Sequence, residues 1–63
     1  MAEHIYPPAE RPDVEVLVDG VWHPGELRGW WDRGGRRLMN VQWRTAPGMT
    51  WIDTLPASRV RDA

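Results

Sequence analysis

Three tryptophans interleaved with arginines are the side chains of this chain best suited to binding chemistry. An indole stacks on nucleobases and on flat cations, and a guanidinium pairs with phosphate or carboxylate through two parallel hydrogen bonds. The tryptophans share one parity in the strands predicted below, which places them on the side that faces solvent. The sequence therefore predicts a binding face built from Trp22, Trp30, Trp51, Arg28, Arg37 and Arg44.

The residues that could act in catalysis are not arranged in the sequence as a catalytic site. His23 lies beside Pro24, and we expect it on the surface, where general-base chemistry would need a carboxylate and a nucleophile around a pocket. Glu26, Asp53 and Ser58 are present, but their spacing favours no such site. We therefore predict no catalytic residues and a protein that is not an enzyme.

Length and composition limit what else the chain can hold. Its 63 residues make one domain with a small core, and five tryptophans supply much of the bulk available to fill it. Cysteine is absent, which excludes disulfides, thiolate zinc sites and redox centres, and two histidines cannot form a structural metal site without carboxylate help. We expect no metal and no cofactor, and a homodimer is a second way to supply the missing core.

Charged residues are distributed unevenly along the chain. Residues 1–20 hold five acidic residues against one arginine, whereas residues 27–61 hold seven arginines against two aspartates. Such an asymmetry marks either a partner surface of opposite sign or an acidic segment that lies against the basic one. All eight basic residues are arginine, yet the pI near 6.0 is low for a dedicated nucleic-acid-binding domain. A protein partner is therefore favoured, and nucleic acid is the alternative.

Signals that direct a chain to a membrane are not evident. No apolar run approaches the roughly 18 residues of a membrane-spanning helix, and the N-terminus lacks the pattern of a signal peptide. We expect a cytoplasmic protein that does not contact a membrane.

Short β-strands are the elements that must hold these side chains. Residues 14–18 alternate and are rich in β-branched residues, which predicts a strand followed by a hairpin turn at Asp19-Gly20. Residues 1–12 contain three prolines and little periodic apolar content, which predicts a flexible, irregular arm. The folded domain is expected over residues 13–61, with 62–63 as a tail. The inward side chains of the first strand are Val14, Val16 and Val18.

The predicted centre of the fold is a hairpin with arms at residues 21–31 and 37–43, joined through Gly34-Gly35. Pro24-Gly25 interrupts the first arm and predicts a β-bulge or an edge position there. By parity, the inward side chains of the two arms are Leu27, Trp31, Met39, Val41 and Trp43, and the outward ones are Trp22, Arg28 and Trp30.

The last third of the chain predicts a turn, a short strand, a 3₁₀ turn and a final strand, which together close the barrel. Pro47-Gly48 fits a type II turn, and the short strand after it is expected to turn Ile52 inward and Trp51 outward. A single 3₁₀ turn over residues 55–59 then leads to a last short strand around Val60. Glycines and prolines spread through the chain exclude a long helix, so the fold class is all-β and the architecture a small five-stranded barrel.

This series of motifs resembles Tudor and Agenet domains, which are small SH3-like β-barrels. The matching residues are Asp19-Gly20, Trp22, Gly25 and Leu27, then Val41 and Trp43, then Trp51-Ile52, then the run from Leu55 to Arg61. The resemblance implies a five-stranded SH3-like (Tudor-like) barrel that binds methylated arginine or lysine in an aromatic cage through cation–π contacts. Carried over by position, Trp43 matches a cage aromatic of the third strand, and His23 stands where the family often has a tyrosine.

Together these observations predict a non-enzymatic macromolecule-binding module with an exposed tryptophan and arginine face. The alternatives are a small nucleic-acid-binding barrel and a structural subunit of a homo-oligomer whose tryptophan face completes the assembly. The candidate binding residues are Trp22, His23, Arg28, Trp30, Arg37, Trp43, Arg44 and Trp51.

Overall fold

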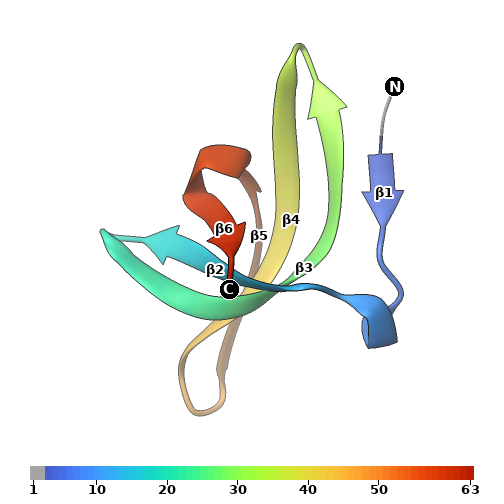
Figure 1. The fold of residues 1–63 in the computed structure, drawn as a ribbon. Coiled ribbons are helices and arrows are strands. Elements are labelled where there is room, and N and C mark those ends of the chain that lie inside the picture. Colours follow the sequence, from blue (N-terminus) through green and yellow to red (C-terminus); the bar gives the residue numbers. More distant parts are fainter. Residues whose placement is uncertain (1–2) are drawn as a thin grey trace.

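The computed structural model describes residues 3–63, and it contains six β-strands, two short 3₁₀ helices and no α-helix in that range (Figure 1). In chain order the elements are β1 (Glu3–Ile5), η1 (Pro8–Glu10), β2 (Asp13–Val18), β3 (Val21–Arg33), β4 (Arg36–Ala46), β5 (Met49–Pro56), η2 (Ala57–Arg59) and β6 (Val60–Asp62). The predicted all-β class is therefore confirmed.

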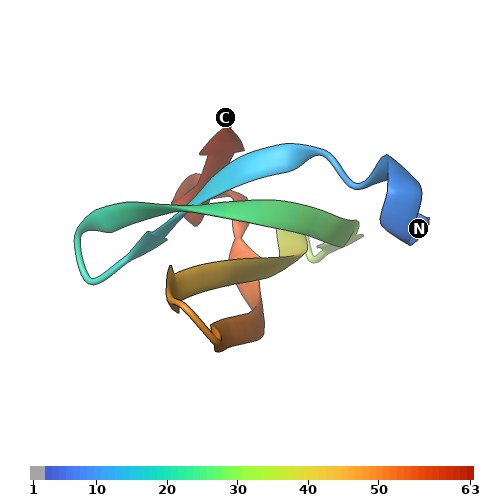
Figure 2. The same cartoon turned by 90° about the horizontal axis from the view of Figure 1, so that it is seen from below.

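All six strands belong to one antiparallel sheet. Its order is β5-β4-β3-β2-β6, and β1 pairs with β3 beyond the end of β2. The sheet bends so strongly that β2 lies across the interior from β5 (Figure 2). The predicted count of five strands is wrong because β1 is a sixth. Within residues 3–63, β5 and β6 are the two ends of the sheet and do not pair with each other.

Two-residue turns connect β2 to β3 and β3 to β4. Asp19 and Gly20 have φ angles of 50° and 79°, and Gly34 and Gly35 have φ angles of 56° and 78°. Left-handed backbone at both central positions is the type I′ turn, whose twist matches that of the flanking strands. The two predicted hairpins are therefore confirmed, and Gly48, with φ of 77°, has the left-handed backbone that the predicted type II turn requires.

A β-bulge in β3 decides which tryptophan faces the core. The register between β3 and β4 shifts between Leu27 and Gly29, so Arg28 is an extra residue without a partner on β4. One extra residue exchanges the two faces for every side chain that follows it. Trp30 packs against the core as a result, and the prediction of Trp31 inward and Trp30 outward is wrong.

Pro24-Gly25 is not a bulge, but the alternative prediction of an edge position holds for Pro24, which pairs with β2 and has no partner on β4. Both residues pair with β2 in unbroken register, and Gly25 pairs with Trp43 on β4. A Cβ atom on Gly25 would lie 2.5 Å from the carbonyl oxygen of Gln42 and 3.1 Å from Cβ of Trp43. Glycine stands there because the backbones of β3 and β4 approach too closely for a side chain.

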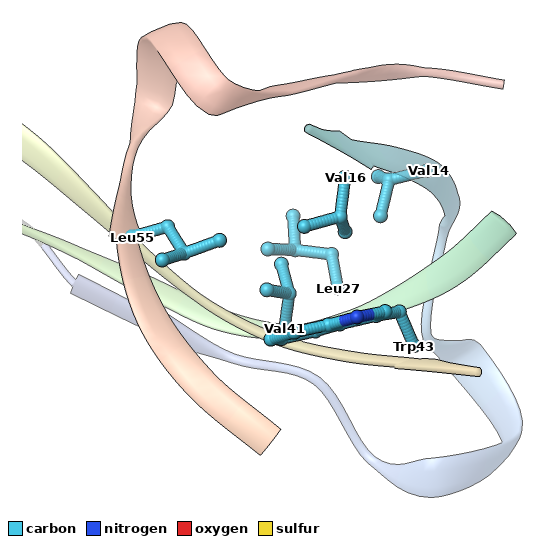
Figure 3. Close-up of a cluster of buried hydrophobic side chains, with 6 residues drawn as sticks. All are labelled: Val14, Val16, Leu27, Val41, Trp43 and Leu55. Carbon is cyan, nitrogen blue, oxygen red and sulfur yellow. The ribbon is translucent and has the colours of Figure 1, made fainter. Parts of the chain in front are cut away.

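The core consists of six buried side chains that point toward one another inside the bend of the sheet (Figure 3). They come from β2, β3, β4 and β5, so all four long strands contribute. Most of the predicted inward set is confirmed, and Val18 and Met39 pack against the core from half-buried positions. The six residues are Val14, Val16, Leu27, Val41, Trp43 and Leu55.

Strand β5 turns its faces opposite to the prediction. Leu55 is buried and therefore defines the inner face of β5. Trp51 is four residues away and lies opposite Trp43 on β4, so it shares that face, while Ile52 is on the outer face and 55% exposed. The prediction of Ile52 inward is wrong because Leu55, and not Ile52, is the residue of β5 that fills the core.

The N-terminal arm is not irregular over residues 3–10. Strand β1 pairs with Gly29–Trp31, and the backbone N–H of Tyr6 donates to the carbonyl oxygen of Arg28 at 3.0 Å. Figure 1 shows β1 beside the outer half of β3, where β2 no longer runs. The prediction of an irregular arm is wrong here because that edge of β3 supplies backbone partners. Residues 1–2 of the predicted arm lie outside the described chain.

The closing turn is attached to the start of the sheet by Arg59. Its Nε and Nη2 atoms both donate to the carbonyl oxygen of Leu17, at 3.0 and 2.8 Å. The predicted 3₁₀ turn and last strand are present as η2 and β6, and Val60 pairs with Val16 of β2. A charged donor on a half-buried carbonyl is among the stronger hydrogen bonds, so Arg59 joins the C-terminus to β2.

We predict that Gly29→Ala will displace β1. The new Cβ would lie 2.9 Å from the carbonyl oxygen of His4 and 2.9 Å from Cδ1 of Ile5, and overpacking of this kind costs about 1–3 kcal/mol. Chemical denaturation should show that loss, and hydrogen exchange should show it concentrated at the Tyr6 amide.

The control for this prediction is the same substitution in a chain that lacks residues 1–5. Without β1 the three atoms nearest to the added methyl group are absent, so Gly29→Ala should change the stability of the shortened chain much less. An equal loss of stability in both chains would show that Gly29 is needed for a reason other than the approach of β1.

Candidate functional site

Trp22 lies on the outer face of the sheet, as predicted, but a cation covers it. It pairs with Leu17, whose neighbour Val16 faces the core, so Trp22 points outward. The guanidinium carbon of Arg61 lies 4.0 Å from the centre of the indole, and Nε of Arg61 donates to Glu15 Oε1 at 2.9 Å. Trp22 is therefore half-buried in an intramolecular cation–π stack.

Trp30 is covered in the same way from two sides. The guanidinium carbon of Arg37 lies 3.8 Å from the indole centre, and its Nε and Nη2 donate to the two carboxylate oxygens of Asp32 at 3.0 and 3.3 Å. The His4 ring is stacked at 6.4 Å and meets the edge of Tyr6 at 4.3 Å. This cluster attaches β1 to the β3–β4 hairpin and leaves little of Trp30 for a ligand.

Arg28 is also engaged within the fold, and His23 does not lie on the outer surface. Nη1 of Arg28 donates to Oδ1 of Asn40 at 3.1 Å, and Nδ2 of Asn40 donates to Oγ1 of Thr54 at 3.2 Å, so the bulge residue links β3 to β4 and β5. His23 pairs with Val16, which places it half-buried on the core-facing side of β3.

The three tryptophans of the predicted face are not brought together. Trp22 and Trp30 are eight residues apart on β3, about 26 Å in an extended strand, and the bulge puts them on opposite faces. Trp51 is on β5. Of the predicted set, Trp51, Arg37 and Arg44 are exposed, and Arg37 is engaged by Asp32 and Trp30.

A groove lined from β2, β4 and β5 contains two of the remaining candidates, Trp43 and Trp51, whereas Arg44 lies outside it. Its volume is about 290 Å³, and Trp43 and Trp51 lie side by side along it as directly opposed residues of β4 and β5. Trp43 is buried, with 7% of its surface exposed, and Trp51 is 47% exposed. The lining residues are Val18, Asp19, Trp43, Thr45 and Trp51.

A second bulge holds the Trp51 indole in place. The register between β4 and β5 shifts between Arg44 and Ala46, which leaves Thr45 as an extra residue. Oγ1 of Thr45 accepts a hydrogen bond from Nε1 of Trp51 at 3.1 Å. The exposed indole is therefore fixed by a partner in its own hairpin.

Exposed apolar side chains gather on the strand that carries Trp51. Met49 is 47% exposed and Ile52 is 55% exposed, so three of the five large apolar side chains that the described chain leaves exposed are on β5. Exposed apolar surface on the inner face, at Trp51, and on the outer face, at Ile52, makes β5 the strand best suited to contact a partner.

Basic charge that is not paired internally concentrates at the tip of the β3–β4 hairpin. Arg33 and Arg36 are exposed on either side of Gly34-Gly35. A shallow hollow of about 380 Å³ runs from Arg36 and Arg37 to Ser58 in η2. This tip lies at the opposite end of the molecule from the β4–β5 turn (Figure 1).

Sequence reasoning missed Asp19, Thr45 and Val18 as members of the site. Asp19 was assigned a turn role, which it has, but the same turn places it at the mouth of the groove. Thr45 is a bulge residue without a local signature. In the sequence, only the position of Asp19, directly after the inward-facing Val18, could have indicated that it lies near the groove.

Within residues 3–63, no group of three or more histidine, aspartate or glutamate side chains is placed to hold a metal ion. In the same range, no helix has the length and apolar character needed to cross a bilayer.

No protein-family model matches the chain, and no curated protein or solved structure is significantly similar to it. Function is therefore inferred from the geometry and chemistry of the groove.

We predict that the Asp32 carboxyl titrates at unusually low pH. Hydrogen bonding to Arg37 lowers its pKa below the ordinary aspartate value, and the same pair raises the pKa of Arg37. Because the folded pKa is depressed, the contribution to stability is present above the unfolded pKa and is lost as pH falls through the folded value.

NMR titration of the Asp32 side-chain carbon measures this directly. The Arg37→Met variant should return the pKa of Asp32 toward its ordinary value, and the difference in stability between wild type and variant should shrink as pH falls, because only the contact of Arg37 with Trp30 then remains. An unchanged Asp32 titration in the variant would contradict the pairing.

Proposed function

We propose that this chain is a non-enzymatic module that binds a protein partner through the groove beside Trp51. The observation that carries the proposal is a half-exposed indole held by a hydrogen bond to Thr45, next to a second, buried indole. An exposed side chain that is already fixed loses little conformational entropy on binding, so it suits recognition. Tryptophan is also enriched among the residues that dominate protein interfaces.

The groove is suited to a basic side chain of the partner. Indole faces attract cations, and the attraction is larger where the site excludes water. Asp19 adds a carboxylate at the mouth, and among residues 3–63 it forms no ion pair of its own. An arginine or lysine that enters between Asp19 and Trp51 would therefore meet both an aromatic surface and an opposite charge.

The architecture we propose for this module is an SH3-like barrel of the Tudor type. In support, β2 to β5 are consecutive neighbours in the sheet, and a 3₁₀ turn returns the chain so that β6 lies beside β2. This agrees with the closing turn that the sequence resemblance implies. The bend of the sheet places β2 across from β5, as a barrel requires (Figure 2).

A protein partner is favoured over nucleic acid by the state of the arginines. Four of the eight are engaged internally, with Asn40, Asp32, the Leu17 carbonyl and Glu15. The engaged arginines are Arg28, Arg37, Arg59 and Arg61. Two of these also cover indoles that base stacking would need.

We predict that Trp51→Ala will weaken the binding of a basic peptide. The probe is acetyl-Gly-Arg-Gly-amide, with acetyl-Gly-Glu-Gly-amide as the acidic control, and the readout is the NMR shift of the Nε1–H of Trp43, which also lines the groove and is present in every variant. Loss of a cation–π contact should weaken the arginine peptide about two- to thirtyfold. Asp19→Asn should weaken it as well, because the opposite charge is removed.

The matched control is Ile52→Ala, which removes a neighbouring exposed apolar side chain from the other face of β5. It should leave peptide binding unchanged. Equal binding of the arginine and glutamate peptides, or shifts that map to the hairpin tip instead of the groove, would contradict the proposal. Titration with single- and double-stranded DNA at two salt concentrations tests the nucleic-acid alternative, since phosphate binding weakens steeply as salt rises.

A further inference from the structure

The two ends of the sheet are protected to different degrees. Natural sheets shield their end strands by keeping them short, by charge, by proline and by bulges. Strand β6 is three residues long and carries Arg61 and Asp62. Strand β5 is eight residues long, and its first four residues, Met49–Ile52, are exposed and carry no charge.

Hydrogen bonding at Thr54 shows which amides of β5 point away from β4. The N–H of Thr54 donates to Oδ1 of Asp53 at 2.7 Å. Backbone groups alternate sides along a strand, so the N–H groups of Thr50 and Ile52 point to the same outer edge. Pro56 fits this alternation because it stands at an outward position and has no N–H to donate.

The outer edge of β5 is therefore blocked in one half and open in the other. Asp53 occupies the Thr54 amide and Pro56 ends the strand, whereas Thr50 and Ile52 have no such protection in the described chain. An open pair of amides two residues apart is a template for one more antiparallel strand.

We propose that a second copy of this chain pairs with the open half of β5, so that the sheet continues from one protomer into its partner. The open amides specify the register. A two-fold axis at Trp51 places Thr50 opposite the partner's Ile52 and Ile52 opposite the partner's Thr50. The N–H groups of Thr50 and Ile52 in both protomers then donate across the interface, four in all. The Thr54 amide, which is bonded to Asp53, is not needed.

The same register is favourable for the side chains. It places the two Trp51 indoles opposite each other, as a cross-strand aromatic pair. Asp53, the only charged residue of β5, lies opposite the partner's Met49 and not opposite its own copy. A second copy is therefore complementary to this edge without any change in sequence.

A domain with a small core gains stability by burying further apolar surface against a second copy. Six buried side chains hold the domain together, and domains of this size bury only about 60% of their unfolded surface. Pairing at β5 would cover the strand on which Met49, Trp51 and Ile52 are exposed.

Ile52→Pro tests the proposal, and Ile52→Ala is its matched control. Both variants remove the exposed side chain, but only proline removes the outward N–H, and proline is tolerated on the outer edge of a sheet. Sedimentation equilibrium over a wide concentration range should show a reversible dimer for wild type and Ile52→Ala. The dimer of Ile52→Pro should be about thirtyfold weaker, because two of its four hydrogen bonds are lost.

Hydrogen exchange provides a readout that needs no substitution. The Thr50 and Ile52 amides of wild type should become protected as protein concentration rises, while the Thr54 amide should not. A strict monomer at all concentrations overturns the proposal, and so does a dimer that both variants weaken equally. If Ile52→Pro fails to fold, the exchange pattern decides alone.

This proposal and the proposed function can fail separately. Binding of the arginine peptide depends on the inner face of β5 and should persist in folded Ile52→Pro. Self-association depends on the outer edge and should persist in Asp19→Asn.

Discussion

Backbone pairing along β3 is the constraint on which the rest of the fold depends. This strand is bonded to β2 and then to β1 on one edge and to β4 on the other, so it connects every part of the sheet. A straight strand of 13 residues would leave no interior. Gly25, where β4 passes closely, and the bulge at Arg28 allow β3 to curve, and a single sheet can then surround its own core.

The bulges also decide what the indoles do. Arg28 exchanges the faces of β3 and places Trp30 against the core, while Thr45 ends the regular pairing of β4 with β5 and fixes Trp51. Arginines cover the other two indoles of the predicted face. The residues that the sequence predicts as one binding surface therefore mostly support the fold, and the proposed recognition depends on one tryptophan, Trp51.

Features determined by local backbone chemistry could be predicted from sequence, and those determined by distant contacts could not. The turns at Asp19-Gly20 and Gly34-Gly35 follow from the left-handed φ angles that those residues accept. No residue type at or beside Arg28 indicates the bulge there. Pro24-Gly25 resembles a bulge in sequence, but Gly25 is needed because the backbones of β3 and β4 lie close together. Strand β1 and the groove depend on partners far along the chain, so alternation alone could not reveal them.

The bond from Arg59 to the Leu17 carbonyl has a kinetic consequence, because it joins residues 42 positions apart. The chain loses conformational entropy when so long a loop closes, and the stabilising contacts form only afterwards. Proteins rich in non-local contacts therefore fold slowly. Strand β2 also receives its second neighbour, β6, from the last few residues of the chain. During synthesis on the ribosome, one edge of β2 would therefore stay unpaired until residues 59–62 have left the exit tunnel, and the domain would complete its fold only after that point.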